Sequence, residues 1–181
     1  MSSPNNLPPL AADGVFAVSA SSIIDAPREK VWGILTDFPS YKEWNPFVRD
    51  SVLVDESEEI LPDQTLAEGK YMLIAPVHLP PTMGKPGMFQ KQSAFVKVVT
   101  VDPENCCLKW ISIVGYPFLL RAERWQSLSV GDDGKTKYET IEVFSGVLAY
   151  VVKLFTQANL KLGFEAMAQE LKRRAEAAAY A

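Results

Sequence analysis

The stretch from Val147 to Ala178, VLAYVVKLFTQANLKLGFEAMAQELKRRAEAA, decides the architecture of this chain. It contains no proline and is rich in Ala, Leu, Lys, Glu and Gln, which favour helix formation. The basic residues 172–174 lie near its end, where cations suit the helix dipole. We predict a long amphipathic helix whose inward stripe consists of Val151, Phe155, Ala158 and Leu162, continued by Phe164, Met167 and Leu171.

Gly163 interrupts this predicted helix at a cost of about 1 kcal/mol relative to alanine. A glycine at this place either permits a close packing contact or leaves clearance for a ligand. Both interpretations stay open from the sequence.

The region before the helix has the composition of strands separated by turns. Residues 15–24 are rich in Val, Ile, Ser and Ala and form the first predicted strand. Turn-like links delimit six further strands, at about 48–56, 68–79, 92–102, 106–115, 118–130 and 136–145. Seven strands and one long helix predict an α+β fold, in which a curved antiparallel sheet wraps the helix. Such an arrangement readily leaves an internal cavity.

Two short helices are predicted between the first two strands. Pro27 is placed at the first helical position, and apolar residues follow at helical spacing up to Phe38. Pro39 ends this helix, and aromatic residues then recur every third position as far as Phe47. The second segment is either a helical hairpin that closes the end of the sheet or an aromatic cage, and the two are compatible.

Two segments and the order of elements resemble the SRPBCC or START-like superfamily. The segments are residues 26–32, APREKVW, and residues 37–47, DFPSYKEWNPF; residues 124–128, RWQSL, and 142–146, EVFSG, are also similar to the superfamily. The resemblance covers residues 15–178 and implies a helix-grip fold, a seven-stranded curved antiparallel sheet around a long C-terminal helix. It also implies a hydrophobic cavity between sheet and helix for a lipid-like, aromatic or polyketide ligand.

Composition narrows the chemistry further. The 181 residues include one histidine and two cysteines, so a zinc site with several histidines and a CxxC redox pair are both excluded. Nucleotide-binding glycine motifs and the hydrolase motif GxSxG are absent too, and we expect no metal and no cofactor. The net charge of −4 argues against a nucleic-acid partner.

The chain is expected to act in the cytoplasm as a single domain. The adjacent Cys106 and Cys107 do not suit an ordinary disulfide, and no apolar run is long enough for an integral membrane segment. Residues 1–13, which include three prolines, are predicted to be a mobile arm before one SRPBCC/START-like domain at 14–181. The sequence names no protein partner.

Candidate catalytic residues are few. His78 is the one side chain whose ordinary pKa suits proton transfer near pH 7, although a lone histidine is more often structural. Tyr71, Arg121 and Glu142 could supply the other polar groups. The residues 80–88 that follow His78 contain three prolines, two glycines and two methionines, and form either a stiff surface loop or a gate over the cavity.

The pairing of the last two strands places Glu142 beside either Glu123 or Arg124, because a shift of one residue changes the partner. If Arg124 faces Glu142, a cross-strand ion pair on the solvent side is the default. If Glu142 or Arg121 points inward, it becomes a polar anchor or an acid/base in the cavity.

The ligand-binding candidates are large apolar or aromatic residues and one glycine. They are Trp44, Phe47, Trp110, Trp125, Tyr138, Phe144, Phe155, Leu162 and Gly163. Aromatic residues of this kind are more often core than ligand contacts, but a cavity lined by them suits a flat apolar molecule.

Three functions are compatible with this pattern. The first is binding of one small hydrophobic molecule in the cavity, because no complete catalytic constellation is visible. The second is a cyclase, dehydratase or isomerase acting in the same cavity on a polyketide-like chain. The third, a co-chaperone or other protein-interaction domain, would expose a large apolar patch outside the cavity.

Overall fold

Seven strands form one antiparallel sheet in the computed structural model, which describes residues 7–179. The strands are β1 (Phe16–Ile24), β2 (Ser51–Val54), β3 (Tyr71–His78), β4 (Lys91–Asp102), β5 (Cys107–Val114), β6 (Leu120–Val130) and β7 (Thr136–Ser145). Their order across the sheet is β1-β7-β6-β5-β4-β3-β2, so β1 crosses over to pair with β7 while the remaining strands follow as hairpins. The predicted α+β fold with a seven-stranded sheet is confirmed.

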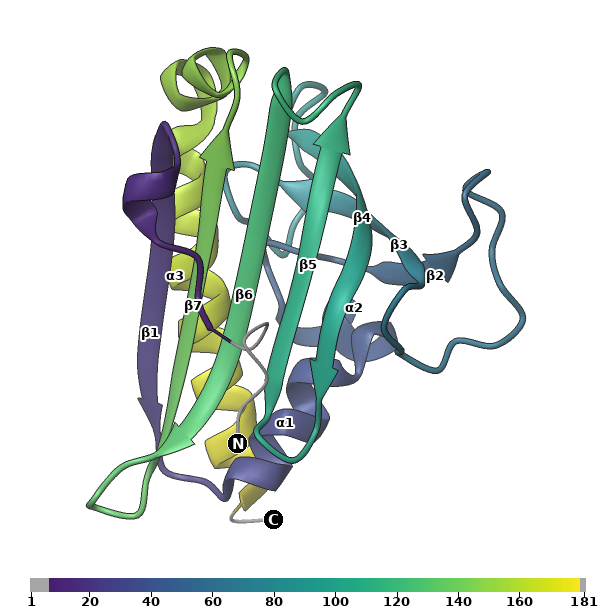
Figure 1. The fold of residues 1–181 in the computed structure, drawn as a ribbon. Helices are drawn as coiled ribbons and strands as arrows, with labels where there is room; N and C mark the ends of the chain where they lie inside the picture. The colour runs from purple at the N-terminus through teal and green to yellow at the C-terminus, as the bar shows by residue number, and fades with distance from the viewer. Residues whose placement is uncertain (1–6, 180–181) are drawn as a thin grey trace.

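The helix α3 (Ala149–Ala179) lies along one face of this sheet (Figure 1), as predicted for residues 147–178. Two short helices, α1 (Arg28–Thr36) and α2 (Tyr41–Trp44), follow β1 with a 3-10 turn, η3 (Phe38–Ser40), between them. They pack near the C-terminal half of α3 and close that end of the sheet. No helix within residues 7–179 is long and apolar enough to cross a membrane.

The predicted inward stripe of α3 is right in its second half and wrong in its first. Phe164, Met167 and Leu171 are buried, whereas Phe155 and Leu162 are 73% and 50% exposed. Val151 and Ala158, of the same half, are exposed as well. The true inward stripe continues backward from Phe164 through Leu160, Thr156 and Val152 at helical spacing. The prediction failed because both sides of the first helical turns are apolar, so composition does not tell the two faces apart.

Two of the element boundaries that differ from the prediction have a clear local cause. Pro27 precedes α1 with an extended ψ of 139°, and its carbonyl oxygen accepts the N–H groups of Lys30 and Val31. The strand predicted at 48–56 is shortened to β2, because the Asp55 carboxylate accepts the N–H groups of two following residues and forms a turn. Of the predicted arm, residues 1–6 lie outside the described part and Ala11–Asp13 form a short 3-10 helix, so its mobility stays a prediction.

The register of β6 and β7 decides which side chains face α3. Arg124 lies opposite Glu142, and Glu123 lies opposite Val143. Arg124 contacts the sulfur of Met167 on α3, so the even-numbered residues of both strands face the helix. Glu123 is on the outer face, where Lys109 and Arg121 both form ion pairs with it.

Candidate functional site

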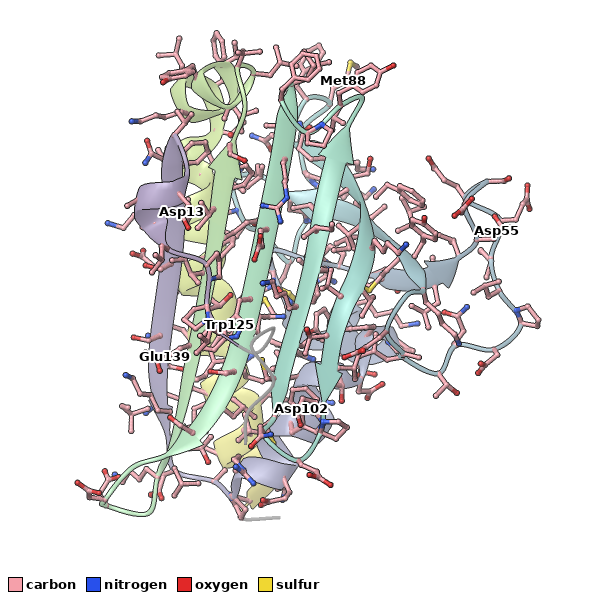
Figure 2. The ribbon with its side chains drawn as sticks, in the orientation of Figure 1. Asp13, Asp55, Met88, Asp102, Trp125 and Glu139 are labelled. Atoms are coloured by element: carbon pink, nitrogen blue, oxygen red, sulfur yellow. The ribbon has the colours of Figure 1, made fainter. Side chains whose placement is uncertain are left out.

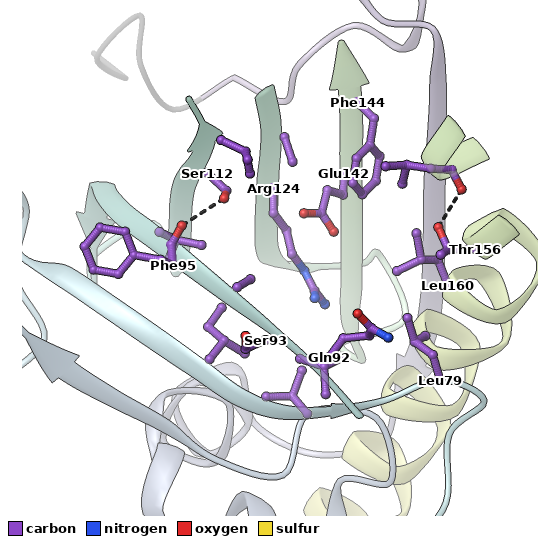
Figure 3. Close-up of a pocket in the computed structure, with 18 of the residues that line it drawn as sticks. Leu79, Gln92, Ser93, Phe95, Ser112, Arg124, Glu142, Phe144, Thr156 and Leu160 are labelled. Carbon is purple, nitrogen blue, oxygen red and sulfur yellow. Dashed lines mark hydrogen bonds between the residues drawn. The ribbon is translucent and has the colours of Figure 1, made fainter. Parts of the chain in front are cut away.

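A cavity of about 350 Å³ lies between the inner face of the sheet and the N-terminal half of α3 (Figure 3). Most of its walls are apolar. They are formed by Phe47, Val48, Ile74, Val77, Leu79, Ala94, Val96, Trp110, Val114, Leu120, Ala122, Phe144, Val152 and Leu160, and by Phe95. The volume falls at the lower end of the range typical of small-molecule pockets.

Two charged side chains enter this apolar space. Arg124 extends into the cavity from β6, and Glu142 lies beside it on β7 (Figure 3). No other Asp, Glu, Lys, Arg or His lines the cavity within residues 7–179. The uncharged polar groups are Gln92, Ser93, Ser112 and Thr156. The hydroxyls of Ser112 and Thr156 already donate to main-chain carbonyls, at 2.8 and 2.7 Å.

Arg124 is only 4% exposed, and aromatic rings surround its guanidinium. The central carbon lies 4.1 Å from the ring centre of Phe164, 5.6 Å from that of Trp110 and 5.8 Å from that of Phe47. Cation–π attraction therefore offsets part of the cost of burying this charge.

The hydrogen bonds of Arg124 are long. Its Nε lies 3.4 Å from Thr140 Oγ1, and its Nη2 lies 3.5 Å from Gln126 Oε1 and 3.4 Å from Met167 Sδ. Good N–H···O bonds are about 2.7–3.2 Å long. No carboxylate within residues 7–179 lies within ion-pair distance of this guanidinium. A buried cation is thus held in place without a full set of partners.

Glu142 has no hydrogen bond or ion pair to any residue in 7–179, although it lies opposite Arg124. Burial raises the pKa of its carboxyl, and the positive charge of Arg124 opposes this only in part. The cross-strand ion pair expected on the solvent side is therefore wrong, since both residues face the cavity. The open alternative, an inward-pointing Glu142, is what the structure has.

A buried polar network of Gln126, Tyr138 and Thr140 lies next to Arg124. The hydroxyl of Tyr138 donates to Gln126 Oε1 at 2.6 Å, and Thr140 Oγ1 donates to a main-chain carbonyl of β6. Burial raises the pKa of Tyr138, so it remains a neutral donor. Tyr138 does not line the cavity, and the prediction that it contacts the ligand directly has no support from its position.

The four predicted catalytic residues do not come together. His78 is buried at the end of β3, with Nδ1 2.8 Å from the carbonyl oxygen of Thr82, and does not line the cavity. The hydroxyl of Tyr71 donates to Glu56 on the surface, and Arg121 is in the outer ion pairs. Of the four, Glu142 alone reaches the cavity because even-numbered positions of β7 face inward.

The predicted ligand contacts divide in the same way. Phe47, Trp110 and Phe144 line the cavity. Trp44 is buried beside the ring of Tyr41, and Trp125 lies on the outer face of β6 (Figure 2), so neither lines it. Phe155 and Leu162 on α3 point to solvent and do not line the cavity either.

Gly163 has a packing role. A Cβ atom at this position would lie 2.4 Å from a ring carbon of Phe47, which is closer than any real contact. The glycine therefore lets Phe47 lie directly against α3, and Phe47 in turn forms part of the cavity wall. The choice between close packing and ligand clearance is resolved in favour of packing.

Sequence reasoning missed the contributions of Arg124 and of the inner residues of α3. The alternation of side chains along β6 could have shown that Arg124 points inward. Ala122 and Leu128, which are also at even-numbered positions, are apolar and buried. A polar residue between them at even spacing must point to the same side. No comparable signal marks Thr156 and Leu160, because apolar residues surround the first turns of α3 on all sides.

A second hollow, of about 560 Å³, lies outside the sheet between α1, β2 and the segment that follows β2. It is more open to solvent, and of its charged residues Lys42 is exposed and Asp50 is half-buried. It contains no buried charge of the kind that Arg124 provides. Among the described residues no cluster of three metal-ligating side chains occurs, and Cys106 and Cys107 form no disulfide.

Comparisons with known proteins agree with this fold. Residues 15–176 match the model of a family described as polyketide cyclase/dehydrase and lipid transport. The oxopyrrolidines biosynthesis cluster protein O of Penicillium oxalicum is 29% identical over 188 residues, which cover 93% of this chain and 90% of that protein.

Solved structures share the fold at low sequence identity. The protein TTHA0849 from Thermus thermophilus has a TM-score of 0.63 at 17% identity, over 90% of this chain and 98% of its own. A START superfamily protein from Mycobacterium smegmatis has a TM-score of 0.58 at 14% identity, with the same coverage of both chains. These likenesses show the fold and carry no information about the ligand.

Proposed function

The chain belongs to the polyketide cyclase/dehydrase and lipid transport family, and from this membership we propose that it binds one small hydrophobic molecule in the cavity between the sheet and α3. The ligand class is lipid-like, aromatic or polyketide. The Penicillium oxalicum relative is named for a cluster of oxopyrrolidine biosynthesis, which supports a small organic molecule as ligand.

The observation that carries the proposal is the cavity itself. A space of about 350 Å³ with mainly apolar walls stays open between the sheet and α3. Burying apolar ligand surface there contributes about 25 cal/mol per Å² before the costs of association. Aromatic rings at Phe47, Trp110 and Phe144 suit a flat or chain-like apolar molecule.

A blocking substitution tests this proposal. Ala122 is on the cavity wall in β6, and Ala122→Phe would fill part of the space. We expect the wild type to bind the neutral fluorophore N-phenyl-1-naphthylamine at one site and Ala122→Phe to bind it at least about tenfold more weakly. Circular dichroism melting would establish that the variant is folded.

The matched control is Ser127→Phe, because Ser127 is on the same strand at an odd-numbered, outward position. It should leave the affinity unchanged. Equal affinities in the wild type and in Ala122→Phe would place the probe elsewhere and contradict the proposal, as would a wild type that does not bind the probe.

The second candidate function is catalysis in the same cavity, as a cyclase, dehydratase or isomerase. Its support is the position of Arg124 and Glu142 in one apolar space. A carboxyl with a raised pKa can exchange a proton with a substrate, and a guanidinium can stabilise negative charge on a carbonyl oxygen. His78, Tyr71 and Arg121 have no part in this proposal because none lines the cavity.

Dehydration of 4-hydroxy-4-phenylbutan-2-one to its enone and water, followed by absorbance, tests this candidate. Catalysis predicts acceleration by the wild type and a loss of about 100-fold in Glu142→Gln, with binding of the substrate retained. A wild type that gives no acceleration over buffer, or a fully active Glu142→Gln, would contradict catalysis and leave binding as the remaining function.

A further inference from the structure

The ligand of the cavity has a distinct chemical class, and this inference rests on the proposed binding function. We propose that the ligand carries an acidic head group, an oxygen anion such as a carboxylate, and that Arg124 binds this anion while the apolar walls bind the remainder.

The first support is the unused hydrogen-bonding capacity of Arg124. A guanidinium has five N–H donors, and the three contacts of Arg124 in the protein are 3.4 to 3.5 Å long. Its Nη1 forms none of these three contacts. Two parallel N–H···O bonds to one carboxylate would meet this deficit, and such charge-assisted bonds are the strong ones.

The second support is the arrangement around the guanidinium. Phe47, Trp110 and Phe164 hold it by their ring faces, so its planar group is kept in one place before a ligand arrives. Aromatic rings attract the charge but accept no strong hydrogen bonds, so the N–H donors stay available. A preorganised donor set of this kind lowers the cost of ordering on binding.

The third support is Glu142. The protein places it opposite Arg124, yet the two groups do not form an ion pair. Arg124 is the one other charged or titratable side chain among the described residues of the cavity wall. Burial raises the pKa of the Glu142 carboxyl, so this residue compensates the positive charge of Arg124 less than a carboxylate with an ordinary pKa would.

The test compares two ligands that differ in charge and share a chain. Decanoic acid is an anion at neutral pH, whereas decanamide is not, and both fill the same apolar space. We expect the wild type to bind the acid at least about tenfold more tightly than the amide, since a buried charge-assisted pair supplies that difference. Isothermal titration or displacement of N-phenyl-1-naphthylamine measures both affinities.

Arg124→Met keeps much of the side-chain volume and removes the charge. It should bind the two ligands equally, with the affinity for the amide within about twofold of the wild type. Arg121→Met, on the outer face of the same strand, is the matched control and should keep the preference for the acid.

The outcomes separate this inference from the function on which it rests. If the wild type binds acid and amide equally, the acidic head group is wrong and the binding function stands. If it binds neither, the binding function itself fails. The comparison within the wild type also stays decisive should Arg124→Met fold poorly.

A second, independent observation concerns the outside of the molecule. Exposed apolar side chains gather at one end, which we call the apolar end; it consists of residues 83–89, 114–118 and 147–155. Met88 and Phe89 are each 88% exposed, Leu154 is 78% and Phe155 is 73%. Figure 2 shows Met88 at the end of the molecule at which α3 begins. Such a concentration of apolar surface marks an interaction site.

Two segments of the apolar end, residues 114–118 and 147–155, are connected to each other and to the cavity. The N–H groups of Val147 and Leu148 donate to the carbonyls of Phe118 and Leu119, at 3.0 and 2.9 Å. Val114 and Val152 belong to these segments and also line the cavity. A partner that covers this end would therefore touch the cavity wall.

The charges of this end identify the partner. Residues 83–89, 114–118 and 147–155 include Lys85 and Lys153 but no aspartate or glutamate, in a chain whose net charge is −4. Apolar side chains with lysines among them, and tyrosines at 116 and 150, match the requirements of a lipid–water interface with negative head groups. We infer that the apolar end docks on a bilayer that contains anionic phospholipid.

Vesicle flotation tests this docking. The wild type should float with vesicles of phosphatidylcholine and phosphatidylserine, and several-fold less with phosphatidylcholine alone. Leu154→Asp should reduce flotation at least about fivefold, because it removes apolar surface and adds a repelled charge. Val130→Asp, at an exposed apolar position in the turn end of β6, is the control and should float like the wild type.

Two results would overturn the docking proposal. One is a wild type that floats with neither kind of vesicle. The other is a stable dimer in light scattering that Leu154→Asp dissociates, since the apolar end would then be covered by a second copy of the chain.

Discussion

Glu142 and Glu123 are carboxyls on neighbouring strands and on opposite faces of the sheet, and their surroundings shift their pKa values in opposite directions. Burial raises the pKa of Glu142. Burial also acts to raise that of Glu123, but hydrogen bonds from Lys109 and Arg121 outweigh it, and the pKa is lowered. The two residues therefore make opposite contributions to the pH dependence of stability.

Glu142→Gln should raise the stability at pH 7. Between the ordinary value of 4.5 and the raised value, the folded state keeps a proton that the unfolded state has lost, so the free energy of unfolding falls as pH rises through this window. Glutamine resembles the neutral carboxyl and avoids this loss. Melting temperatures should be higher for the variant at pH 7 and converge with the wild type near pH 4; a lower melting temperature for the variant at pH 7 would contradict the assignment.

Glu123→Gln should have the opposite effect. A lowered pKa stabilises the folded state above the unfolded value, and this stability is lost as pH falls through the folded pKa. The substitution leaves Lys109 and Arg121 without their carboxylate and should cost about 1 to 3 kcal/mol at pH 7. Urea unfolding at pH 7 and at acid pH measures this; an unchanged midpoint at pH 7 would show that the ion pairs contribute nothing.

How far single residues could be predicted depended on strand register. The pairing of Arg124 with Glu142 was one of two alternatives that the sequence left open. The default expectation placed this pair on the solvent face of the sheet, and this was wrong because both residues face the cavity. Arg124 and Gln126 occupy two consecutive inward positions of β6. Both are polar and buried, which is an exception to the rule that polar side chains of a strand face solvent. Such exceptions are characteristic of functional sites, where local rules are broken for chemistry.

At the scale of elements, α3 divides into two halves with different surroundings. From Leu160 onward the inner face is packed against β1 and α1, whereas the first three turns border the cavity and the apolar end. The helix itself was predictable from composition and the absence of proline. The direction of its first half was not, because it depends on which apolar face the sheet covers.

Gly163 lies between the two halves of α3 and packs against the ring of Phe47. Gly33 of α1 is a helical glycine without such a contact. Gly163→Ala should destabilise the protein by about 1 to 3 kcal/mol, since the new methyl group would overlap the Phe47 ring and overpacking outweighs the gain in helix propensity. Thermal unfolding measures the change, and the variant should also bind ligand more weakly because Phe47 is displaced from the cavity wall.

Gly33→Ala is the matched control. A Cβ atom there meets no atom within 4 Å, so the same substitution should stabilise α1 by up to about 1 kcal/mol. If both glycines responded alike, the close contact with Phe47 would not be the cause.

For the whole molecule, the order of strands and helices and the resemblance in residues 15–178 sufficed to predict the helix-grip fold. They also gave the cavity its general place between sheet and helix. The contents of the cavity and the apolar end depend on how side chains from distant segments meet, and no local pattern encodes that. The large exposed apolar patch, which was expected only for a protein-interaction domain, is an example.

The four tryptophans make the central claim directly measurable. Trp110 lines the cavity, Trp32 borders the open hollow outside the sheet, Trp44 is in the core and Trp125 is on the outer face. Each has one indole N–H that gives its own signal in a ¹H–¹⁵N spectrum.

Titration of ¹⁵N-labelled protein with decanoic acid is the most direct test of binding in the cavity. The account predicts that the Trp110 indole signal shifts and saturates at one equivalent, while the signals of Trp32 and Trp125 stay in place. A shift at Trp32 with Trp110 unchanged would place the ligand in the outer hollow and contradict the account.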